Sequence, residues 1–257
     1  MHRLNLRGSL KSRSFLMLGG VLSFLLLAGG AAVASPVISW STSNNQGGHL
    51  YSANAQVLNN NNNTWSIVLT NTGGVSSLNM HTLTGFFWVD SSTGAYTKVG
   101  AVANAGSGVF NDNGSAAAGL VSDHWGYKNN LGLGSFNQGI GAAGFGLFGG
   151  SNAFTGNSSL QGDDWGLVNG FAPGGIAGNQ NPWVSNSAVF TFGGQVTANQ
   201  FGLARFQYGS ELTQPSFEVL PPTGTPVTPE IGSVYQMMAA GLPLIGLGVA
   251  RRRRRTS

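Results

Sequence analysis

Short runs of apolar residues, many of them β-branched or aromatic, recur between residues 35 and 219. Residues 64–70 show the pattern, because Trp65, Ile67 and Leu69 would face one side of a strand and their polar neighbours the other. Clusters of Gly, Asn and Ser separate the runs, and no long window outside the two ends keeps the spacing of an amphipathic helix. The pattern predicts an all-β, two-sheet sandwich with jelly-roll-like connectivity.

The loops between these runs are also readable from the sequence. Five consecutive asparagines, residues 59–63, predict a hairpin loop because Asn tolerates left-handed backbone geometry. Residues 132–156 are rich in Gly and contain Phe136, Phe145, Phe148 and Phe154; we expect a wide loop folded over the sandwich by these rings, with a Gly-rich adhesive surface as the alternative. The predicted strands cover residues 37–41, 50–58, 64–70, 83–90, 96–102, 109–110, 119–122, 166–168, 188–192, 201–208 and 216–219.

The first 34 residues have the organisation of an export signal. A basic stretch precedes an apolar stretch, and Ala32 and Ala34 occupy the −3 and −1 positions before Ser35. Signal peptidase accepts small residues at these two positions. We therefore predict a signal helix in residues 1–34, export by the Sec machinery and cleavage after Ala34, with an uncleaved N-terminal anchor as the alternative.

The C-terminal end predicts a membrane segment. Residues 231–250 carry no charge, and a helix of that length covers about 30 Å, the thickness of a hydrocarbon core. We predict a Pro-rich stalk at residues 220–230, a transmembrane helix at residues 231–250 and a cytoplasmic tail at residues 251–257; a buried core helix is the alternative. The basic residues of the tail are Arg251, Arg252, Arg253, Arg254 and Arg255.

This three-part ending resembles the PEP-CTERM sorting signal. The resemblance implies processing by an exosortase in a Gram-negative envelope, although Ile231 stands where that family usually has Pro. Residues 50–57, 68–72, 83–89 and 205–217 are similar to successive blocks of an ectodomain found in exosortase-sorted proteins, which implies an envelope or matrix protein without assigned catalysis. The motif residues are Thr228, Pro229, Glu230, Ile231, Gly232 and Ser233.

A second sorting interpretation remains open. Leu220, Pro221, Pro222, Thr223 and Gly224 fit the Leu-Pro-x-Thr-Gly pattern and resemble a sortase substrate, which is cut after Thr and joined to peptidoglycan. A hydrophobic span and a basic tail are common to both systems. A Pro-rich linker that matches by chance is the remaining alternative.

Charge placement changes the meaning of the composition. The chain of 257 residues has a formal charge of +4 and a pI near 9.8, which taken alone suggests a nucleic-acid binder. Nine of the twelve basic residues lie in the two ends, however, and residues 35–228 carry three bases against seven acids. We therefore expect no nucleic-acid partner. The absence of Cys excludes disulfides, thiolate zinc sites and Cys nucleophiles.

Candidate chemistry in the middle of the chain is sparse. His49, His81 and His124 lack metal-ligand spacing, and the adjacent Asp163 and Asp164 do not make a glycosidase pair, so we expect neither catalysis nor a resident cofactor. A Ca²⁺ site is the alternative to ordinary turn chemistry for the loop oxygens of residues 111–114 and of Asp123, Asp163 and Asp164.

Tryptophan suggests the best specific activity, because exposed rings stack on sugars. Trp88, Trp125 and Trp165 are the candidates for stacking, alongside Trp40 and Trp183, with core positions as the alternative for each. Residues 123–129 and 163–169 also share Asp-x-Trp-Gly-x-x-Asn, which suggests two similar loop-to-strand corners.

Together these features favour a non-enzymatic exported protein. We expect it to be held in the membrane by the C-terminal helix, sorted by an exosortase, and delivered to the cell surface or extracellular matrix in a structural or adhesive role. Exopolysaccharide is the expected partner there. A secreted lectin-like or carbohydrate-active protein is the alternative.

Overall fold

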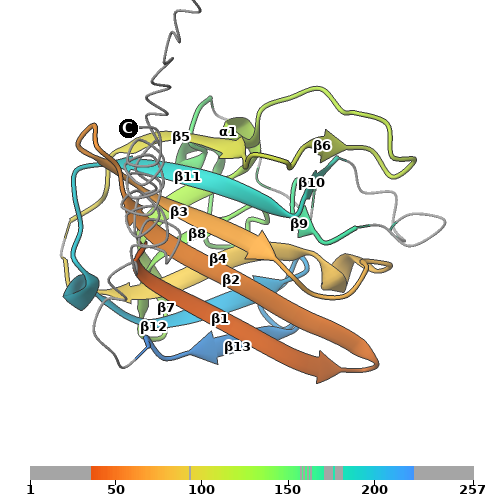
Figure 1. Ribbon diagram of the computed structural model, residues 1–257, viewed down its shortest axis with the longest axis horizontal. Coiled ribbons are helices and arrows are strands. Elements are labelled where there is room, and N and C mark those ends of the chain that lie inside the picture. The colour runs from red at the N-terminus through yellow and green to blue at the C-terminus, as the bar shows by residue number, and fades with distance from the viewer. Residues whose placement is uncertain are drawn as a thin grey trace, which may run out of the picture. The chain divides into compact units, whose positions relative to one another are not determined.

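The computed structural model describes residues 36–222, apart from residues 93, 157, 159, 161, 163, 171–175 and 177–181. These residues form two β-sheets. The first sheet has five strands in the order β1, β2, β3, β11, β5, and all of its pairings are antiparallel. Figure 1 shows these strands side by side. Their bounds are β1 Pro36–Gln46, β2 His49–Asn59, β3 Thr64–Asn71, β11 Ser187–Gly193 and β5 Lys98–Ala103.

The second sheet is organised around β4, Leu83–Asp90. One side of β4 pairs with β12, Phe201–Tyr208, which in turn pairs with β13, Ser216–Val219. The other side of β4 pairs with two strands. Along most of its length it pairs with β8, which in turn pairs with β7. At Leu83 it pairs with β9, which pairs with β10, and β10 pairs with β6. The bounds are β8 Phe136–Gly141, β7 Gly126–Leu133, β9 Leu167–Val168, β10 Trp183–Ser185 and β6 Val109–Phe110.

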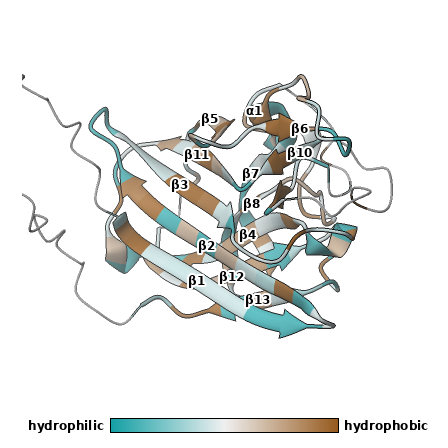
Figure 2. Ribbon diagram, turned by 45° about the vertical axis from the view of Figure 1, so that its right-hand side comes forward, coloured by the Kyte–Doolittle hydropathy of each residue, from teal (hydrophilic) through white to brown (hydrophobic). Residues whose placement is uncertain are grey.

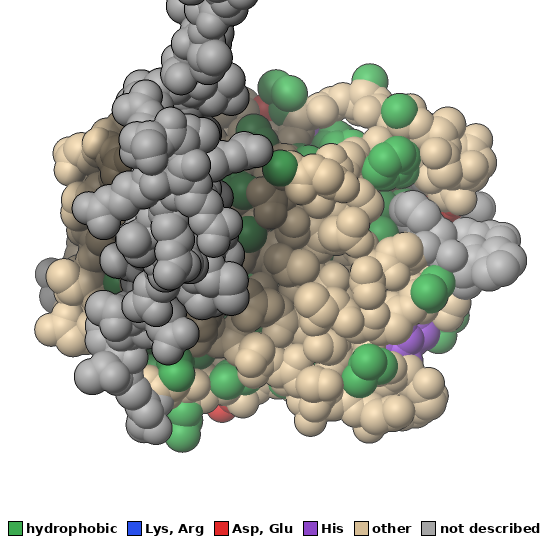
Figure 3. Space-filling model, in the orientation of Figure 1, with side chains coloured by type: hydrophobic (Ala, Val, Ile, Leu, Met, Phe, Trp, Pro, Cys, Tyr) green, Lys and Arg blue, Asp and Glu red, His purple; other side chains and the backbone are tan. Residues whose placement is uncertain are grey.

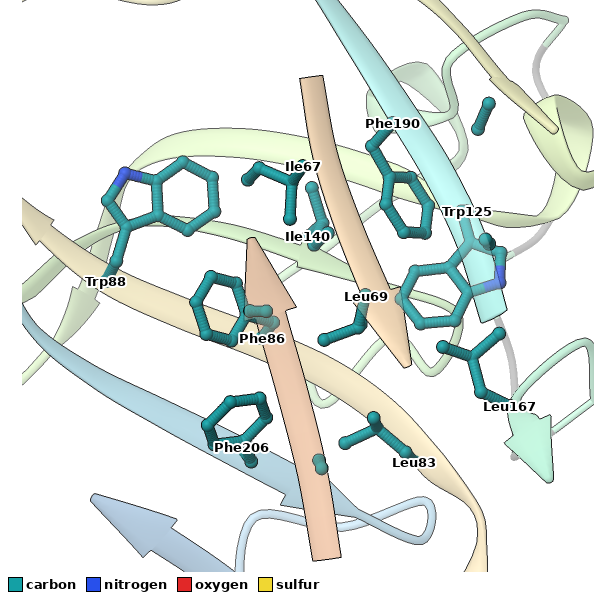
Figure 4. Close-up of a cluster of buried hydrophobic side chains, with 14 of the residues drawn as sticks. Ile67, Leu69, Leu83, Phe86, Trp88, Trp125, Ile140, Leu167, Phe190 and Phe206 are labelled. Atoms are coloured by element: carbon teal, nitrogen blue, oxygen red, sulfur yellow. The ribbon is translucent and has the colours of Figure 1, made fainter. Parts of the chain in front are cut away.

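The main core lies between the two sheets. Trp40 of β1 contacts Phe86 of β4 with ring centroids 5.6 Å apart, and Tyr51 of β2 contacts Tyr208 of β12 at 5.0 Å. Figure 4 shows how side chains from both sheets converge on this layer. Alternation along the strands of the first sheet, also visible as banding in Figure 2, directs apolar residues inward and polar residues outward. The all-β, two-sheet sandwich is therefore confirmed.

A second, smaller core lies on the outer face of β4. Phe87 points away from the main core and packs with Leu131, Phe136, Phe148, Ala153 and Leu160. We call the described residues of 142–160 the covering segment, because they bury this outer face. Phe148 is buried and Phe145 is half-buried in this outer core, while Phe154 reaches into the main core against Phe190 and Phe192. The aromatic rings therefore fold this part of the Gly-rich stretch over the sandwich, as predicted.

Several boundaries differ from the sequence prediction. The first ten residues of the expected Gly-rich loop belong largely to β7 and β8, which the Gly content concealed, and β10 was also missed. Residues 119–122 were expected as a strand, whereas Val121–His124 form the short helix α1. The jelly-roll-like connectivity is not confirmed, because β1, β2 and β3 follow one another as a meander within one sheet. Short 3₁₀ helices occupy Asn79–His81, Gly150–Asn152 and Ala198–Gln200.

Two hairpin turns set the register of β1, β2 and β3 in the first sheet. The predicted hairpin loop in the Asn tract is confirmed: it joins β2 to β3, it begins after Asn59, the last residue of β2, and Asn63 has the left-handed φ of 56°. A second hairpin was missed: Gly47 and Gly48, at φ 61° and 80°, join β1 to β2. Two adjacent residues with positive φ make the tight two-residue turn whose twist matches that of the strands. Because of this turn, β1 continues to Gln46, five residues beyond its predicted end. These additional residues are all polar, so the apolar pattern could not predict them.

The predicted ends of the chain lie outside the described residues. These are the signal helix of residues 1–34, most of the stalk, the membrane helix of residues 231–250 and the tail. Within the part of the chain that the structure describes, no helix is both long and apolar enough to cross a membrane.

A close approach at Gly73 provides a test of the packing between β2 and the loop that follows β3. A Cβ atom at this position would lie 2.4 Å from the backbone oxygen of Leu50, so the backbone must shift to admit it. We expect Gly73→Ala to lower the free energy of unfolding by about 1–3 kcal/mol in urea denaturation. The matched control is Gly149→Ala, whose Cβ would meet nothing within 4 Å. Equal stability of the two variants would contradict this packing.

Candidate functional site

The outward side of the first sheet is a continuous uncharged surface. In one cross-strand row Ser39 pairs with Gln56, Gln56 with Val68, and Val68 with Val189; in the next, Ser41 pairs with Asn54 and Asn54 with Thr70. We call the outward side chains of β1, β2, β3 and β11 the polar face. Its members are Ser39, Ser41, Ser43, Asn45, Leu50, Ser52, Asn54, Gln56, Leu58, Ser66, Val68, Thr70, Val189 and Thr191. Ser66 is buried beneath its neighbours, and Leu50 is 40% exposed.

Hydroxyl and amide groups hold one another in place on this face. The hydroxyls of Ser52 and Thr72 lie 2.8 Å apart, those of Ser66 and Thr191 lie 3.1 Å apart, and Asn54 donates from Nδ2 to the Trp40 carbonyl at 3.2 Å. Each hydroxyl or amide can both donate and accept, so these contacts leave hydrogen-bonding capacity for a ligand. In Figure 3 the uncovered part of this side is mainly tan, the colour shared by uncharged polar side chains and backbone.

The nearest basic residue of the same sheet is directed elsewhere. Lys98 on the neighbouring strand β5 donates from Nζ to the carbonyl oxygens of Ser151 and Ala153, which lie in the covering segment. Partial burial lowers the pKa of its ammonium group. Lys98 therefore fixes the covering segment, and the polar face offers neutral hydrogen bonds.

The predicted sugar-stacking platform is wrong. Trp88 and Trp125 are fully buried and Trp165 is 4% exposed, so none of the three offers a ring face to a sugar. Trp40 and Trp183 are also core residues. A sandwich without disulfides needs large apolar side chains in its core, and the tryptophans meet that need.

The repeated Asp-x-Trp-Gly motif brings two corners into contact. Trp125 and Trp165 each stand two residues or fewer before a strand, β7 and β9, and Trp125 donates from Nε1 to the Trp165 carbonyl at 2.8 Å. His124 stacks on the Trp165 ring with centroids 4.1 Å apart. The second motif is a loop-to-strand corner, as predicted, whereas the first leads from the end of helix α1 into β7. Asp123 accepts a hydrogen bond from the Thr155 hydroxyl and so ties α1 to the covering segment.

A stacked histidine pair was not anticipated. His49, at the start of β2, and His81, just before β4, lie parallel with ring centroids 3.5 Å apart. Tyr51 packs edge-on against both rings, and Nδ1 of His81 lies 3.3 Å from the Ser77 hydroxyl. Burial, and next the positive charge of a protonated His49, lower the pKa of His81 to about 4. The two histidines are 32 residues apart in the sequence, so no local spacing indicates that they meet. The one available signal is that each stands at or just before the start of a strand, because loops at the same end of a sandwich lie close together.

Asp90 anchors the loop that follows β4. Asp90 is buried and accepts hydrogen bonds from the Tyr96 hydroxyl at 2.6 Å and the Ser92 amide at 2.6 Å. The backbone amide of Tyr96 donates a hydrogen bond to the Tyr127 hydroxyl at 2.9 Å. The Tyr127 hydroxyl in turn donates to Oε1 of Gln138 at 2.6 Å. Burial is the main cause that raises the pKa of both tyrosines, to about 12 for Tyr127. This network attaches the loop after β4 to β7 and β8.

The candidate Ca²⁺ oxygens are engaged in turn and anchoring contacts where the structure describes them. Asp112 accepts a hydrogen bond from Nε1 of Trp183, and Oδ1 of Asn113 accepts from the Ser115 amide and hydroxyl. No group of three or more His, Asp or Glu able to hold a metal ion occurs among the described residues. Asp163 lies outside them.

The sorting residues also lie outside the described part of the chain. They are Ala32, Ala34 and Ser35 at the predicted cleavage site, Thr228 to Ser233 in the motif and Arg251 to Arg255 in the tail. Of the sortase-like pentapeptide the structure describes Leu220, which is 73% exposed, and the two prolines after it.

Comparison of the chain with models of known protein families, with curated proteins and with solved structures gave no match.

The histidine pair predicts a pH-dependent stability. The pKa of His81 is about 4 in the folded protein and 6.5 when exposed, so the unfolded chain binds more protons between these values. The stability from a neutral His81 is complete above about pH 6.5 and is lost as the pH falls toward about 4. Urea denaturation across this range should show a steeper loss for the wild type than for His81→Gln.

The control for this experiment is His124→Gln. Burial lowers the pKa of His124, but the neighbouring Asp123 opposes the shift, so this variant should keep most of the wild-type pH dependence. A His81 imidazole that titrates near 6.5 by nuclear magnetic resonance would refute the interpretation.

Proposed function

We propose that this protein is exported to the cell surface or extracellular matrix, where it has a structural or adhesive role and contacts neutral exopolysaccharide through its polar face. The observation that carries the proposal is the composition of that face. Its outward side chains supply hydroxyls, amides, two valines and two leucines across four neighbouring strands and no charge.

The chemistry of a neutral polysaccharide matches these groups. Sugar hydroxyls both donate and accept hydrogen bonds, as Ser, Thr, Asn and Gln side chains do. The C–H faces of sugar rings are apolar and can pack against Val68 and Val189, which lie side by side in the middle of the sheet. Each neutral hydrogen bond contributes only about 0.5–1.5 kcal/mol net, so one domain binds weakly and many copies are needed for firm attachment. That behaviour suits a matrix component.

The route to this location is proposed from the sequence. Residues 1–34 would direct export and be removed after Ala34, and residues 228–257 would act as a PEP-CTERM-type signal that holds the chain in the membrane until an exosortase processes it. The exposed Leu220 and the prolines after β13 agree with an accessible stalk between the domain and the span.

A lectin-like function built on tryptophan stacking loses its support, because the six tryptophans of the chain are core residues. A polysaccharide contact through the sheet differs from it in an observable way. It would be broad, weak and insensitive to salt, since it uses no ionic pairs.

Removal of the C-terminal signal tests the sorting proposal. A chain that lacks residues 228–257 should be released into the medium or periplasm instead of being retained and processed, because it has lost the span and the basic tail. Cell fractionation with mass spectrometry of the mature C-terminus measures this outcome. An unchanged location, or a wild-type C-terminus at Thr223 joined to peptidoglycan, would refute exosortase sorting; the latter would establish the sortase route.

Substitutions on the polar face test the polysaccharide contact. The triple variant Ser41→Ala, Gln56→Ala, Thr70→Ala removes three hydrogen-bonding groups and should sediment less with purified neutral exopolysaccharide than the wild type. The control, Asn199→Ala with Thr213→Ala, removes exposed polar groups from the 3₁₀ helix before β12 and from the turn before β13. Binding that is equal in both variants, or that high salt abolishes, would contradict a neutral contact through this face.

A further inference from the structure

The edges of the sheets differ in how they are protected against pairing with another strand. At β5, one edge of the first sheet, the Ser122 hydroxyl donates to the Ala101 carbonyl at 2.7 Å and accepts from the Ala101 amide at 2.7 Å. The Ser122 side chain therefore occupies the two backbone groups of Ala101 that an incoming strand would use, and α1 lies against this edge. Protection of this kind is how natural sheets avoid edge-to-edge association.

The edges of the second sheet are protected by other means. β13 has only four residues and carries Glu218, and β6 has only two residues. β7 carries Lys128, and its pairing with β8 is irregular between Asn129 and Leu133. Short length, charge and irregular pairing each make an edge a poor template.

β1, the other edge of the first sheet, has none of these protections beyond its first residues. It has 11 residues, and its pairing with β2 is regular from Ile38 to Gln46 after a single irregularity next to Pro36. It contains no charged residue. Its first half packs over the second sheet, where Trp40 donates from Nε1 to the Gly202 carbonyl at 3.2 Å, and most of its second half is exposed.

The hairpin turn determines which backbone groups of β1 face outward. Across the two-residue turn, Gln46 and His49 form a hydrogen-bonded pair, and the pairs alternate along an antiparallel ladder. Thr42 and Asn44 therefore direct their amide and carbonyl groups to β2. Ser41, Ser43 and Asn45 direct theirs away from it, where no strand among the described residues pairs with them.

We propose that this edge binds a second copy of the same strand, so that two molecules pair β1 to β1 in antiparallel orientation around a two-fold axis. Such pairing is self-complementary, because serine and asparagine side chains then lie opposite serine and asparagine, and no like charges meet. The two five-stranded sheets become one continuous sheet. Both polar faces lie on the same side of it, which doubles the uncharged surface.

The chain offers a direct test because it has no native cysteine. Single variants Ser41→Cys, Ser43→Cys and Asn45→Cys of the full-length chain, purified in mild detergent, are oxidised and run on a non-reducing gel. A disulfide bridges Cα atoms about 4.4–6.8 Å apart, so only the position nearest the two-fold axis should give an efficient cross-linked dimer. Val102→Cys, 59% exposed on the protected edge, and Gln56→Cys, one strand inward, should give none.

A proline substitution gives an independent measurement. Ser43→Pro removes an outward amide and leaves the bonds to β2 intact, so it should convert a dimer into a monomer by sedimentation and light scattering. Ser43→Ala, which keeps the amide, should remain dimeric, and circular dichroism checks that both variants fold. A wild type that stays monomeric, or cross-linking as strong at Val102→Cys as on β1, would overturn the proposal. Neither result depends on polysaccharide binding.

Discussion

Burial of β4 on both faces is the constraint on which the rest of this domain depends. Phe86 and Trp88 enter the main core, while Phe87 points outward into a second core. A strand in this position must be largely apolar, and Leu83–Asp90 is, apart from Thr84 and Asp90, whose buried side chains have hydrogen-bond partners. It also must be covered on its outer side, because an exposed ring of this size next to other apolar side chains would form a patch that promotes association.

The Gly-rich stretch supplies that cover, and close packing explains part of its composition. A Cβ at Gly139 would lie 2.6 Å from the Phe87 ring, so β8 can pair beside β4 only without a side chain there. At Gly144 it would lie 2.4 Å from the Leu160 carbonyl, within the covering segment itself. The glycines at these positions therefore serve internal packing, and the adhesive interpretation of the whole stretch is not needed to explain them.

The sequence predicted strands well where burial alternates or is continuous, and poorly elsewhere. β4, β12 and β13 have the predicted bounds because their apolar residues meet a core on at least one side. The polar half of β1 carries no such signal, since an edge strand needs apolar residues only where it covers the other sheet. Tryptophan could not be assigned from the sequence, because ring stacking on a sugar and packing in a core use the same side chain. The histidine pair could not be predicted because it depends on the path of the connection between β3 and β4, which brings His81 beside the start of β2.

The distribution of polar groups separates two kinds of surface. Ionisable side chains such as Lys98 and Asp90 are directed to loops and to the covering segment, where they hold irregular backbone in place. The sheet face keeps only neutral groups, whose cross-strand contacts already fix their orientation. Under the proposed function, such a surface recognises polysaccharide by many weak, geometrically regular contacts, and the strength of attachment grows with the area of the sheet. Any device that enlarges the sheet, such as pairing along the unprotected strand β1, therefore increases attachment without a new kind of contact.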